Sequence, residues 1–475
     1  MKKQDSKPPP LPAATTNGKK KNDLVVYVYN VVEDEWQFIN SLSTPQEKTA
    51  DIRAGEVSTD CFYFAFASEQ NGIYVSPYNI SDEFQTYVQK LVKNKDVEVL
   101  HPLIDSHRIC LDLIEDRERF NYIVNKAKDY DRLVLLSYSA SPEFYDLKNA
   151  FTKAGLNVYT PEAPEIENAW TVNFFGSKSG IRQLAGQSAA QEPDFVMPEG
   201  VICVGKFDAA KIAANKYLKE KGVVIKTNKG CSGNGVLIFR ENDLPNTYTE
   251  CEKTIQTLLD KEPYWEKFPI VVESLVNVNP AIGNGFPNVE FKIAKNGRID
   301  MLFYGSLVVN QQGNYLGMDI GEDTLNDRAT ARVMDTGFYI AERYSAAGYR
   351  GHFDVDMIAA KNNQIYVGES NTRNTGATDT FKIADKLIGK DFLYDSYIIT
   401  RSHYKLDFKD PLSITEVLAF LKPILYSPSK KEGLILNAEH CLKEKQLTYT
   451  IFGKSKKRAY DIQEKLQQII AQATK

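Results

Sequence analysis

An apolar run that ends in a lysine and a glycine-rich turn is the feature that most constrains this chain. Residues 223–227 read Val-Val-Ile-Lys-Thr, three glycines follow closely, and a second apolar run begins at Val236. Glycine has no Cβ, so backbone N–H groups can close around phosphate oxygens, and a lysine ammonium adds charge for the same anion. The pattern predicts a β-hairpin with a phosphate-binding turn; an inert hairpin with an incidental lysine is the alternative. The candidate residues are Lys226, Gly230, Ser232, Gly233 and Gly235.

A second pair of apolar runs, 352–360 and 364–371, carries acidic residues. Asp356 lies within the first run and Glu369 near the end of the second, with Asn371 two positions later. An antiparallel hairpin would bring these side chains to one face, where directly opposed like charges destabilise a sheet unless a cation lies between them. Carboxylate and amide oxygens suit Mg²⁺ shared with a polyphosphate. We therefore predict a metal site, with a solvated and inert acid pair as the alternative, and Arg373 pointing toward the same site.

These two features together resemble the ATP-grasp superfamily. Lys226 with its glycine turn is followed far downstream by Asp356 and by the run Glu369-x-Asn371-x-Arg373, in the order and at the separations that the family shows. The resemblance spans residues 170–392. It implies an α/β fold class, with a pre-ATP-grasp α/β domain followed by a two-lobed (α+β) ATP-grasp fold. Residues 433–470, and the Thr-Gly that follows Arg373, resemble the pheganomycin-type peptide ligases.

The resemblance also implies roles for further residues. Lys178 looks like the first lysine of the family, although Ser177 stands where an aspartate is usual. Glu273 would accept from the adenine amino group, and the backbone of Leu275 would pair with the adenine ring nitrogen. Glu290 would lie near the ribose or the second phosphate face, with an exposed strand residue as the alternative.

The implied activity is that of an ATP-dependent carboxylate-amine ligase. Such an enzyme activates a carboxylate as an acyl phosphate, couples it to an amine in an amide or peptide bond, and releases ADP and phosphate. Arg373 would bind the carboxylate and stabilise the oxyanion, beside an acceptor loop that contains Asn374 and Gly376. The implied cofactors are ATP and Mg²⁺, with Mn²⁺ as a substitute. His352 is more often a packing or hydrogen-bonding residue at such a position than a general base.

The composition limits the classes of partner that this chain can bind. The 475 residues carry a formal net charge of -4, which leaves no broad basic surface for nucleic acid. The six cysteines show no C-x-x-C pair, and no apolar run reaches membrane-spanning length. We expect a cytoplasmic enzyme with small-molecule carboxylate and amine substrates (amino acids or peptides) and with no nucleic-acid or membrane partner. The sequence leaves the oligomeric state open, with a homodimer among the options.

The alternation of apolar runs and helical patterns suggests several structural units. We expect a disordered tail over 1–22, the pre-ATP-grasp domain over 23–168, the ATP-grasp domain over 169–400, and a C-terminal extension over 401–475. Within the grasp, the glycine-loop lobe would span about 205–275 and the metal-site lobe about 276–400. Residues 24–32 and 61–67 are predicted strands, and 41–59 is predicted to be a loop or insertion.

Three alternatives remain open at this stage. An ATP-grasp kinase or a carboxylase-type enzyme would use the same residues, although no biotin or carrier-protein motif is present. A non-catalytic nucleotide-binding regulator would not need Arg373. An interaction scaffold would rely on the charged helix predicted near the C-terminus.

Overall fold

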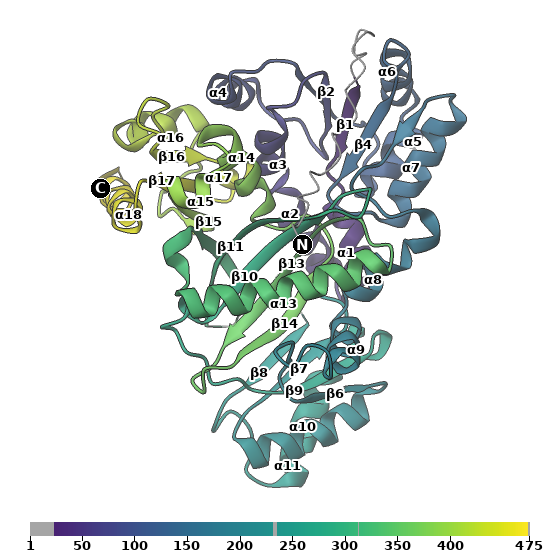
Figure 1. Cartoon of the computed structure of the whole chain (residues 1–475), viewed down its shortest axis with the longest axis vertical. Coiled ribbons are helices and arrows are strands. Elements are labelled where there is room, and N and C mark those ends of the chain that lie inside the picture. Colours follow the sequence, from purple (N-terminus) through teal and green to yellow (C-terminus); the bar gives the residue numbers. More distant parts are fainter. Residues whose placement is uncertain (1–22, 231–234, 312, 474–475) are drawn as a thin grey trace, which may run out of the picture.

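The computed structural model describes residues 23–230, 235–311 and 313–473. The predicted tail, 1–22, and the predicted loop residues Ser232 and Gly233 lie outside the described residues. The described chain forms three sheets. In Figure 1 the parallel sheet lies at the upper right, the eight-stranded sheet crosses the middle, and the four-stranded sheet lies at the bottom.

The first sheet is parallel and has the strand order β3-β2-β1-β4-β5. Because side chains alternate along a strand, Val26 and Val28 pack in one apolar cluster and Tyr27 in another, so both faces of the sheet are covered. The strands are β1 (Leu24–Val28), β2 (Gly72–Val75), β3 (Val97–Leu100), β4 (Leu133–Ser137) and β5 (Val158–Tyr159). The helices are α1 (Val31–Ile39), α2 (Pro45–Glu56), α3 (Thr59–Phe66), α4 (Asp82–Val92), α5 (Ile109–Glu115), α6 (Arg117–Ala127) and α7 (Pro142–Lys153).

Three local predictions in this region were wrong. The strand predicted over 24–32 ends at Val28, where α1 begins soon after. The predicted loop 41–59 contains helix α2, whose N-terminus is fixed by a capping box between Thr44 and Glu47. The predicted strand 61–67 lies in helix α3, every residue of which is buried, so the sequence carries no amphipathic period to distinguish helix from strand.

The second sheet is antiparallel, with the order β6-β9-β7-β8. It contains the predicted glycine hairpin, whose pairing of β7 with β8 is confirmed. Helices α10 and α11 pack on it through a compact apolar cluster. The strands are β6 (Gly200–Cys203), β7 (Val223–Thr227), β8 (Val236–Phe239) and β9 (Ile270–Ser274). The helices before and within this unit are α8 (Trp170–Phe175), α9 (Lys178–Ser188), α10 (Lys206–Glu220), α11 (Tyr248–Leu259) and α12 (Tyr264–Lys267).

The third sheet is also antiparallel, in the order β14-β13-β10-β11-β12-β15-β17-β16. The long helix α13 covers the apolar face at the β14 end (Figure 1). The strands are β10 (Pro287–Ile293), β11 (Ile299–Val309), β12 (Tyr315–Ile320), β13 (Gly351–Ala359), β14 (Ile365–Asn371), β15 (Tyr397–Lys405), β16 (Gly433–Leu436) and β17 (Gln446–Gly453). The helices are α13 (Asp327–Ala346), α14 (Thr378–Leu387), α15 (Phe392–Asp395), α16 (Ile414–Leu421), α17 (His440–Lys443) and α18 (Lys456–Ala473).

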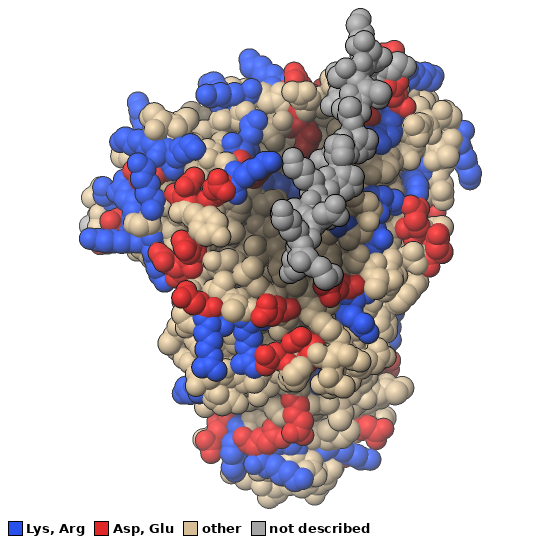
Figure 2. Space-filling view, in the orientation of Figure 1, with Lys and Arg blue, Asp and Glu red and all other residues tan. Residues whose placement is uncertain are grey.

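The surface carries charges of both signs. Figure 2 shows Lys and Arg interspersed with Asp and Glu on the visible face. Among the described residues, no helix combines the length and the apolar character needed to cross a membrane.

Candidate active site

One face of the eight-stranded sheet carries a strip of polar side chains on β10, β13 and β14. The register pairs Asn288 on β10 with Asp356 on β13, and Asp356 in turn with Glu369 on β14. Val289, the residue next to Asn288, points to the opposite face and is completely buried under α13. The alternation of the strands therefore collects the carboxylates on one face, and the predicted antiparallel pairing of Asp356 with Glu369 is confirmed.

Two amide side chains bridge the acids of this strip. Asn288 Nδ2 donates to Asp354 Oδ2 at 3.1 Å and to Asp356 Oδ1 at 2.7 Å. Asn371 Nδ2 donates to Asp354 Oδ1 at 3.0 Å and to Asp356 Oδ2 at 3.2 Å. These four hydrogen bonds hold the carboxylates of Asp354 and Asp356 side by side.

The crowded acids fit a hard cation. Burial, followed by the charge of Glu290, raises the pKa of Asp354 to about 7. Burial, and then the charges of Asp354 and Glu369, also raise the pKa of Asp356. A divalent cation with oxygen ligands would offset this repulsion, so the predicted set of Asp356, Glu369 and Asn371 suits Mg²⁺.

Lys178 reaches the same strip from helix α9. Ser177 caps this helix by accepting a hydrogen bond from the Gly180 backbone N–H at 3.0 Å, which places Lys178 at the first helical position. Lys178 Nζ lies 3.2 Å from Glu369 Oε2. The Lys178 charge is the main cause that lowers the pKa of Glu369.

Lys226 is held by a buried carboxylate on the neighbouring strand. Lys226 Nζ lies 2.7 Å from Glu273 Oε2, and the Arg182 guanidinium lies 2.5 Å from Glu273 Oε1. Burial acts to raise the pKa of Glu273, but the charges of Lys226 and Arg182 outweigh it and lower the pKa. Both oxygens of Glu273 thus bind cations here. Leu275 follows β9 directly and is partly buried.

The described end of the glycine turn shows why a glycine stands at position 235. Gly235 has φ +78, and a Cβ at this position would lie 2.2 Å from Thr227 Cγ2, so only glycine fits without strain. The Gly235 carbonyl accepts from the Thr227 backbone N–H at 2.8 Å, which closes the hairpin. Gly230, at the other end of the turn, lines the cleft described below.

Arg373 leaves β14 toward the first sheet. Its Nε donates to Asp34 Oδ2 on α1 at 2.9 Å, and a terminal nitrogen lies 4.0 Å from Glu35 Oε1. Asn374 is 3% exposed, and its Nδ2 donates to the carbonyls of Ser137 and Tyr138 at the end of β4, at 3.0 Å each. The amide of Asn374 thus anchors this turn on the first sheet.

The loop after Arg373 rests on Glu290 and Tyr315. Glu290 is completely buried and accepts from the Thr375 and Thr378 hydroxyls, at 2.9 Å and 2.6 Å. It is not among the residues that line the cleft in the described part of the chain. Tyr315 Oη donates to the Gly376 carbonyl at 3.3 Å, and the Tyr315 ring lies where a larger residue than Gly376 would press against it.

His352 lies between two carboxylates. Its Nδ1 lies 3.3 Å from Glu290 Oε1, and its Nε2 lies 3.6 Å from Glu162 Oε1 in the segment after β5. The side chain is 1% exposed. The His352 ring is therefore buried and in polar contact with two acidic side chains.

One cleft brings several of these parts together, although Lys226, Glu273 and Asp356 are not among the described residues that line it. Its lining includes Asp34 and Glu35 from α1, Lys178 from α9, Lys229 and Gly230 from the glycine turn, and Glu369 to Arg373 from the end of β14. Lys229 Nζ donates to Asn173 Oδ1 at 2.8 Å, and burial lowers its pKa. Cations and carboxylates from all three sheets or their flanking helices therefore face one space.

Some cleft and strip residues were not expected from the sequence. Asp354 could have been found, because it lies two positions before Asp356 and so on the same face of the strand. Lys229 could also have been found, because it stands within the predicted glycine-rich turn. Asp34 and Glu35 left no usable signal, because acids near the start of a helix are common for electrostatic reasons, and Asp34 lies in the first turn of α1.

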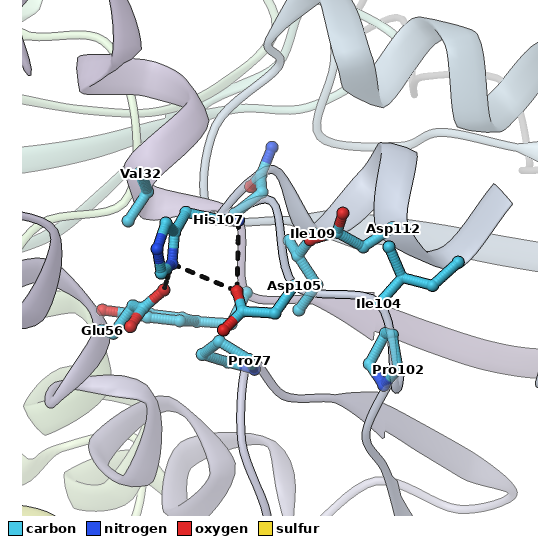
Figure 3. Close-up of a pocket in the computed structure, with 11 residues that line it drawn as sticks. Val32, Glu56, Pro77, Pro102, Ile104, Asp105, His107, Ile109 and Asp112 are labelled. Atoms are coloured by element: carbon cyan, nitrogen blue, oxygen red, sulfur yellow. Dashed lines mark hydrogen bonds and ion pairs between the residues drawn. The ribbon is translucent and has the colours of Figure 1, made fainter. Parts of the chain in front are cut away.

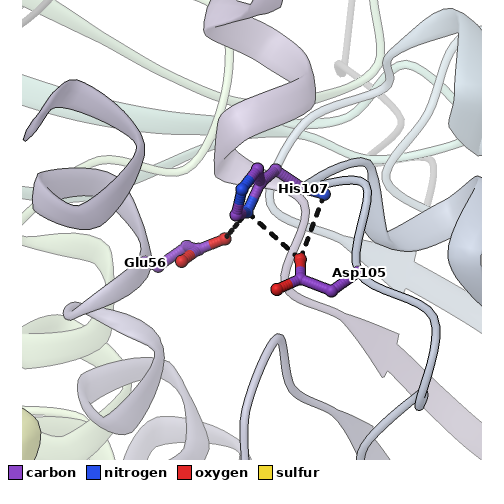
Figure 4. A group of neighbouring side chains, drawn as sticks. All are labelled: Glu56, Asp105 and His107. Carbon is purple, nitrogen blue, oxygen red and sulfur yellow. Dashed lines mark hydrogen bonds and ion pairs between the residues drawn. The ribbon is translucent and has the colours of Figure 1, made fainter. Parts of the chain in front are cut away.

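A second hollow lies at the carboxyl ends of β1, β2 and β3, lined in part by Glu56, Asp105 and His107 (Figure 3). His107 Nδ1 lies 3.2 Å from Glu56 Oε1 and 3.1 Å from Asp105 Oδ1 (Figure 4). The ligand atoms lie within 4.8 Å of one another, a spacing that a metal ion could use. The ring nitrogen already contacts both carboxylates, so the contacts within the triad themselves account for the arrangement.

Comparison with known proteins identifies the fold. The sequence matches no family model and no curated protein. The structure is similar to an ADP complex of purK, N5-carboxyaminoimidazole ribonucleotide synthetase, with a TM-score of 0.55 and 9% identity over 95% of this chain and 97% of that one. It is also similar to a biotin carboxylase complex with β-γ-ATP from Campylobacter jejuni, with a TM-score of 0.54 and 12% identity over 92% and 89% of the two chains. The chain has the ATP-grasp fold.

A third similar structure is the biotin carboxylase domain dimer of Hydrogenobacter thermophilus 2-oxoglutarate carboxylase, in complex with MgADP, ADP and bicarbonate. It has a TM-score of 0.50 and 13% identity, over 91% of this chain and 86% of that one. The predicted fold class is therefore confirmed. In this ATP-grasp fold, the cleft lies where the glycine hairpin, the acidic strip and the first sheet meet.

Proposed function

We propose that this chain is an ATP-dependent carboxylate-amine ligase. It activates a carboxylate as an acyl phosphate and couples it to an amine, forming an amide or peptide bond and releasing ADP and phosphate. The observation that carries the proposal is the single cleft lined by Lys178, Gly230, Asn371 and Arg373. Groups suited to phosphate, to a metal ion and to a carboxylate are thereby within reach of one bound nucleotide.

We assign the following roles to these residues. Lys178, Lys226 and the glycine turn bind the phosphates of ATP, and Asp356, Glu369 and Asn371 hold Mg²⁺. When bound, Mg²⁺ supplies charge neutralisation for the transferring phosphoryl group. Arg373 binds the substrate carboxylate and later the oxyanion. The nucleotide and MgADP complexes among the similar structures support ATP and Mg²⁺ as the cofactors.

The proposed domain organisation follows the sheets. The first sheet forms the pre-ATP-grasp domain, and the four-stranded sheet forms the glycine-loop lobe. The eight-stranded sheet forms the metal-site lobe, and it also contains the C-terminal strands β15 to β17. The adenine contacts of Glu273 and Leu275, and the likeness to pheganomycin-type peptide ligases, stay predictions.

The test is a phosphate-release screen with MgATP over amino acids and dipeptides offered in pairs. We expect ADP and phosphate only when both a carboxylate and an amine are present, and a product whose mass is the sum of the two substrates less one water. Arg373→Ala serves as the inactive control. Transfer of phosphate to a hydroxyl without release, or ATP binding without turnover, would refute the proposal.

Activation of bicarbonate is the second candidate. It is favoured by the bicarbonate in the Hydrogenobacter complex, which shares this fold. The same screen separates the two functions, because phosphate release in a carboxylating enzyme would require added bicarbonate and would incorporate its labelled carbon.

A further inference from the structure

Lys229 lies at the start of the glycine turn and faces the cleft. It stands three positions after Lys226 and directly before Gly230. The Lys226 ammonium group pairs with Glu273 on the neighbouring strand, whereas the Lys229 side chain is part of the cleft lining. Lys229 Nζ donates to Asn173 Oδ1 on helix α8 at 2.8 Å. The hairpin therefore presents two lysines in different directions, and the second of them reaches the cleft.

The start of the glycine turn is held against α8 and α9 at two points. One is the hydrogen bond from Lys229 to Asn173. The other joins Asn228 Oδ1 to the backbone N–H of Ser179, in the first turn of α9, at 2.7 Å. The Asn228 backbone N–H also donates to the Pro269 carbonyl at 2.9 Å. Because the backbone beside Lys229 is fixed in this way, its side chain is directed into the cleft.

The described lining of the cleft contains as many carboxylates as cations. The cations are Lys178, Lys229 and Arg373, and the carboxylates are those of Asp34, Glu35 and Glu369. Lys178 Nζ lies 3.2 Å from Glu369 Oε2, and Arg373 Nε donates to Asp34 Oδ2 at 2.9 Å. In the described part of the chain, Lys229 Nζ instead donates to the neutral amide of Asn173. Lys229 therefore differs from the other two cations in the kind of group that holds it.

A lysine held by a neutral amide can exchange that amide for an anion. A hydrogen bond from an ammonium group to a phosphate oxygen is stronger than one to an amide oxygen. Asn173 is an exposed residue, so its amide can bind water once Lys229 has left. Lys178 and Arg373 would each have to give up or share a carboxylate to make the same move. Lys229 is thus the cation of the cleft that an incoming phosphate recruits most readily.

The charge state of Lys229 also depends on such an anion. Burial lowers the pKa of Lys229, and the charge of Asp34 acts in the opposite direction. The charges of Lys178 and Arg373 lower the pKa further. A phosphate oxygen at Nζ would favour the protonated form of the lysine.

The place of Lys229 in the cleft indicates which phosphate it meets. In the proposed function, Glu369 and Asn371 hold Mg²⁺ and Arg373 binds the substrate carboxylate. These residues and Lys229 line the same cleft. The γ-phosphoryl group has to lie between the metal ion and the carboxylate when it is transferred. It is therefore the part of ATP that comes within reach of the Lys229 ammonium group.

We propose that Lys229 is a further catalytic residue, whose ammonium group leaves Asn173 and contacts the γ-phosphoryl group of ATP during its transfer. This inference rests on the proposed function. In the step, a carboxylate oxygen of the substrate forms a bond to the γ-phosphorus. The bond from this phosphorus to the β,γ-bridging oxygen breaks, and ADP leaves with the electron pair. Lys229 stays protonated and donates to a γ-phosphoryl oxygen, whose negative charge it offsets.

The experiment compares two nucleotides that differ in the γ-phosphoryl group. ADP and the β,γ-imido analogue of ATP are titrated into the full-length protein with Mg²⁺, and the Kd of each is measured by calorimetry. The variants are Lys229→Gln and Asn173→Ala. Lys219→Gln, at an exposed position on α10 of the same lobe, is the matched control. Binding of ADP also shows that each variant is folded.

We expect Lys229→Gln to raise the Kd of the imido analogue about 10-fold to 100-fold, the scale of one hydrogen bond to a charged group. The Kd of ADP should hardly change, because ADP lacks the group that Lys229 contacts. Asn173→Ala should leave the Kd of the imido analogue unchanged or lower it, because the lysine no longer has to leave an amide. Lys219→Gln should change neither value.

Three outcomes would overturn the inference. Equal rises in Kd for the two nucleotides would mean that Lys229 serves the phosphates that they share. No rise for either would mean that Lys229 does not contact the nucleotide. The same selective loss in Asn173→Ala would mean that the tie between the turn and α8 matters, rather than a contact to the γ-phosphoryl group. A wild-type protein that binds neither nucleotide would instead refute the proposed function itself.

Discussion

Lys226 on β7 and Glu273 on β9 form an ion pair with 2.7 Å between Nζ and Oε2, and only 3% of the Glu273 side chain is exposed. Arg182 binds the other oxygen of the same carboxylate. A buried carboxylate shared by two cations fixes the direction of each, because breaking one contact leaves a charge without its partner. This pair therefore fixes the direction of Lys226, the lysine that we propose binds phosphate.

Substituting Glu273→Gln should weaken nucleotide binding. The amide keeps the shape of the side chain but releases Lys226 and Arg182 from a charge-assisted bond. We expect the Kd for a non-hydrolysable MgATP analogue to rise about tenfold, measured by titration calorimetry. Glu199→Gln is the control, since the Glu199 side chain is 88% exposed and pairs with Lys216 at 3.4 Å. An unchanged Kd would show that Lys226 is oriented by other contacts.

Substituting Asp356→Asn should raise the stability of the metal-free protein but lower its activity. Without metal, the change removes one of several like charges from the strip, and it also removes one of the two oxygens that accept from Asn288 and Asn371. We expect the relief of repulsion to outweigh the lost hydrogen bond, so the Tm measured in EDTA should rise. Mg²⁺-dependent phosphate release should fall about 100-fold or more, because a hard carboxylate ligand is lost. Asp300→Asn, on a partly exposed side chain of β11 that pairs with Arg298, should alter neither quantity. A Tm that falls in EDTA would contradict the view of Asp354, Asp356 and Glu369 as mutually repelling acids.

Substituting Glu290→Leu should loosen the loop that follows Arg373. The carboxylate is completely buried and accepts from Thr375 and Thr378, so an apolar replacement leaves buried donors without a partner. We expect a loss of about 2 to 4 kcal/mol in the free energy of unfolding, measured by urea denaturation. Glu290→Gln retains one acceptor oxygen, so its free energy of unfolding should fall by less. Equal losses in the two variants would mean that side-chain volume, rather than hydrogen bonding, matters at this position.

The glycine hairpin and the acidic strip could be predicted because their signals are local. Alternation along β13 and β14 is enough to put Asp356 and Glu369 on one face, and a turn rich in glycine is enough to mark the hairpin. The order of these features along the chain resembles that of the ATP-grasp superfamily, and this resemblance was enough to predict the fold class.

The remaining parts could not be predicted because they depend on packing between distant segments. Asp34 and Arg373 are 339 residues apart and meet only when the first sheet docks on β14. Helix α3 is buried on every side, so apolar residues occur all around it. Its sequence therefore lacks the apolar and polar alternation that would identify a helix. Ser139, whose hydroxyl donates to Asp34 Oδ1 at 2.6 Å, is likewise unremarkable in sequence.

A last prediction concerns how the stability of the part of the chain built on the first sheet depends on pH. Burial outweighs the hydrogen bonds that Glu33 accepts and raises its pKa from 4.5 to about 7. A carboxyl with a raised folded-state pKa favours the native state most when protonated. Its contribution is full below the unfolded pKa and is lost as the pH rises through about 7, a loss of about 3 kcal/mol.

Glu33→Gln should remove this dependence. Glutamine keeps an acceptor for the Cys110 backbone N–H and cannot ionise, so the variant should gain stability relative to the wild type as the pH rises from about 5 to about 8. Urea denaturation at stepped pH measures the difference. Glu118→Gln, where the side chain is 87% exposed, is the matched control and should follow the wild-type curve. Parallel wild-type and Glu33→Gln curves across this range would show that Glu33 is ionised in the native state, because its hydrogen bonds from Cys110, Asn30 and Ser141 then outweigh its burial.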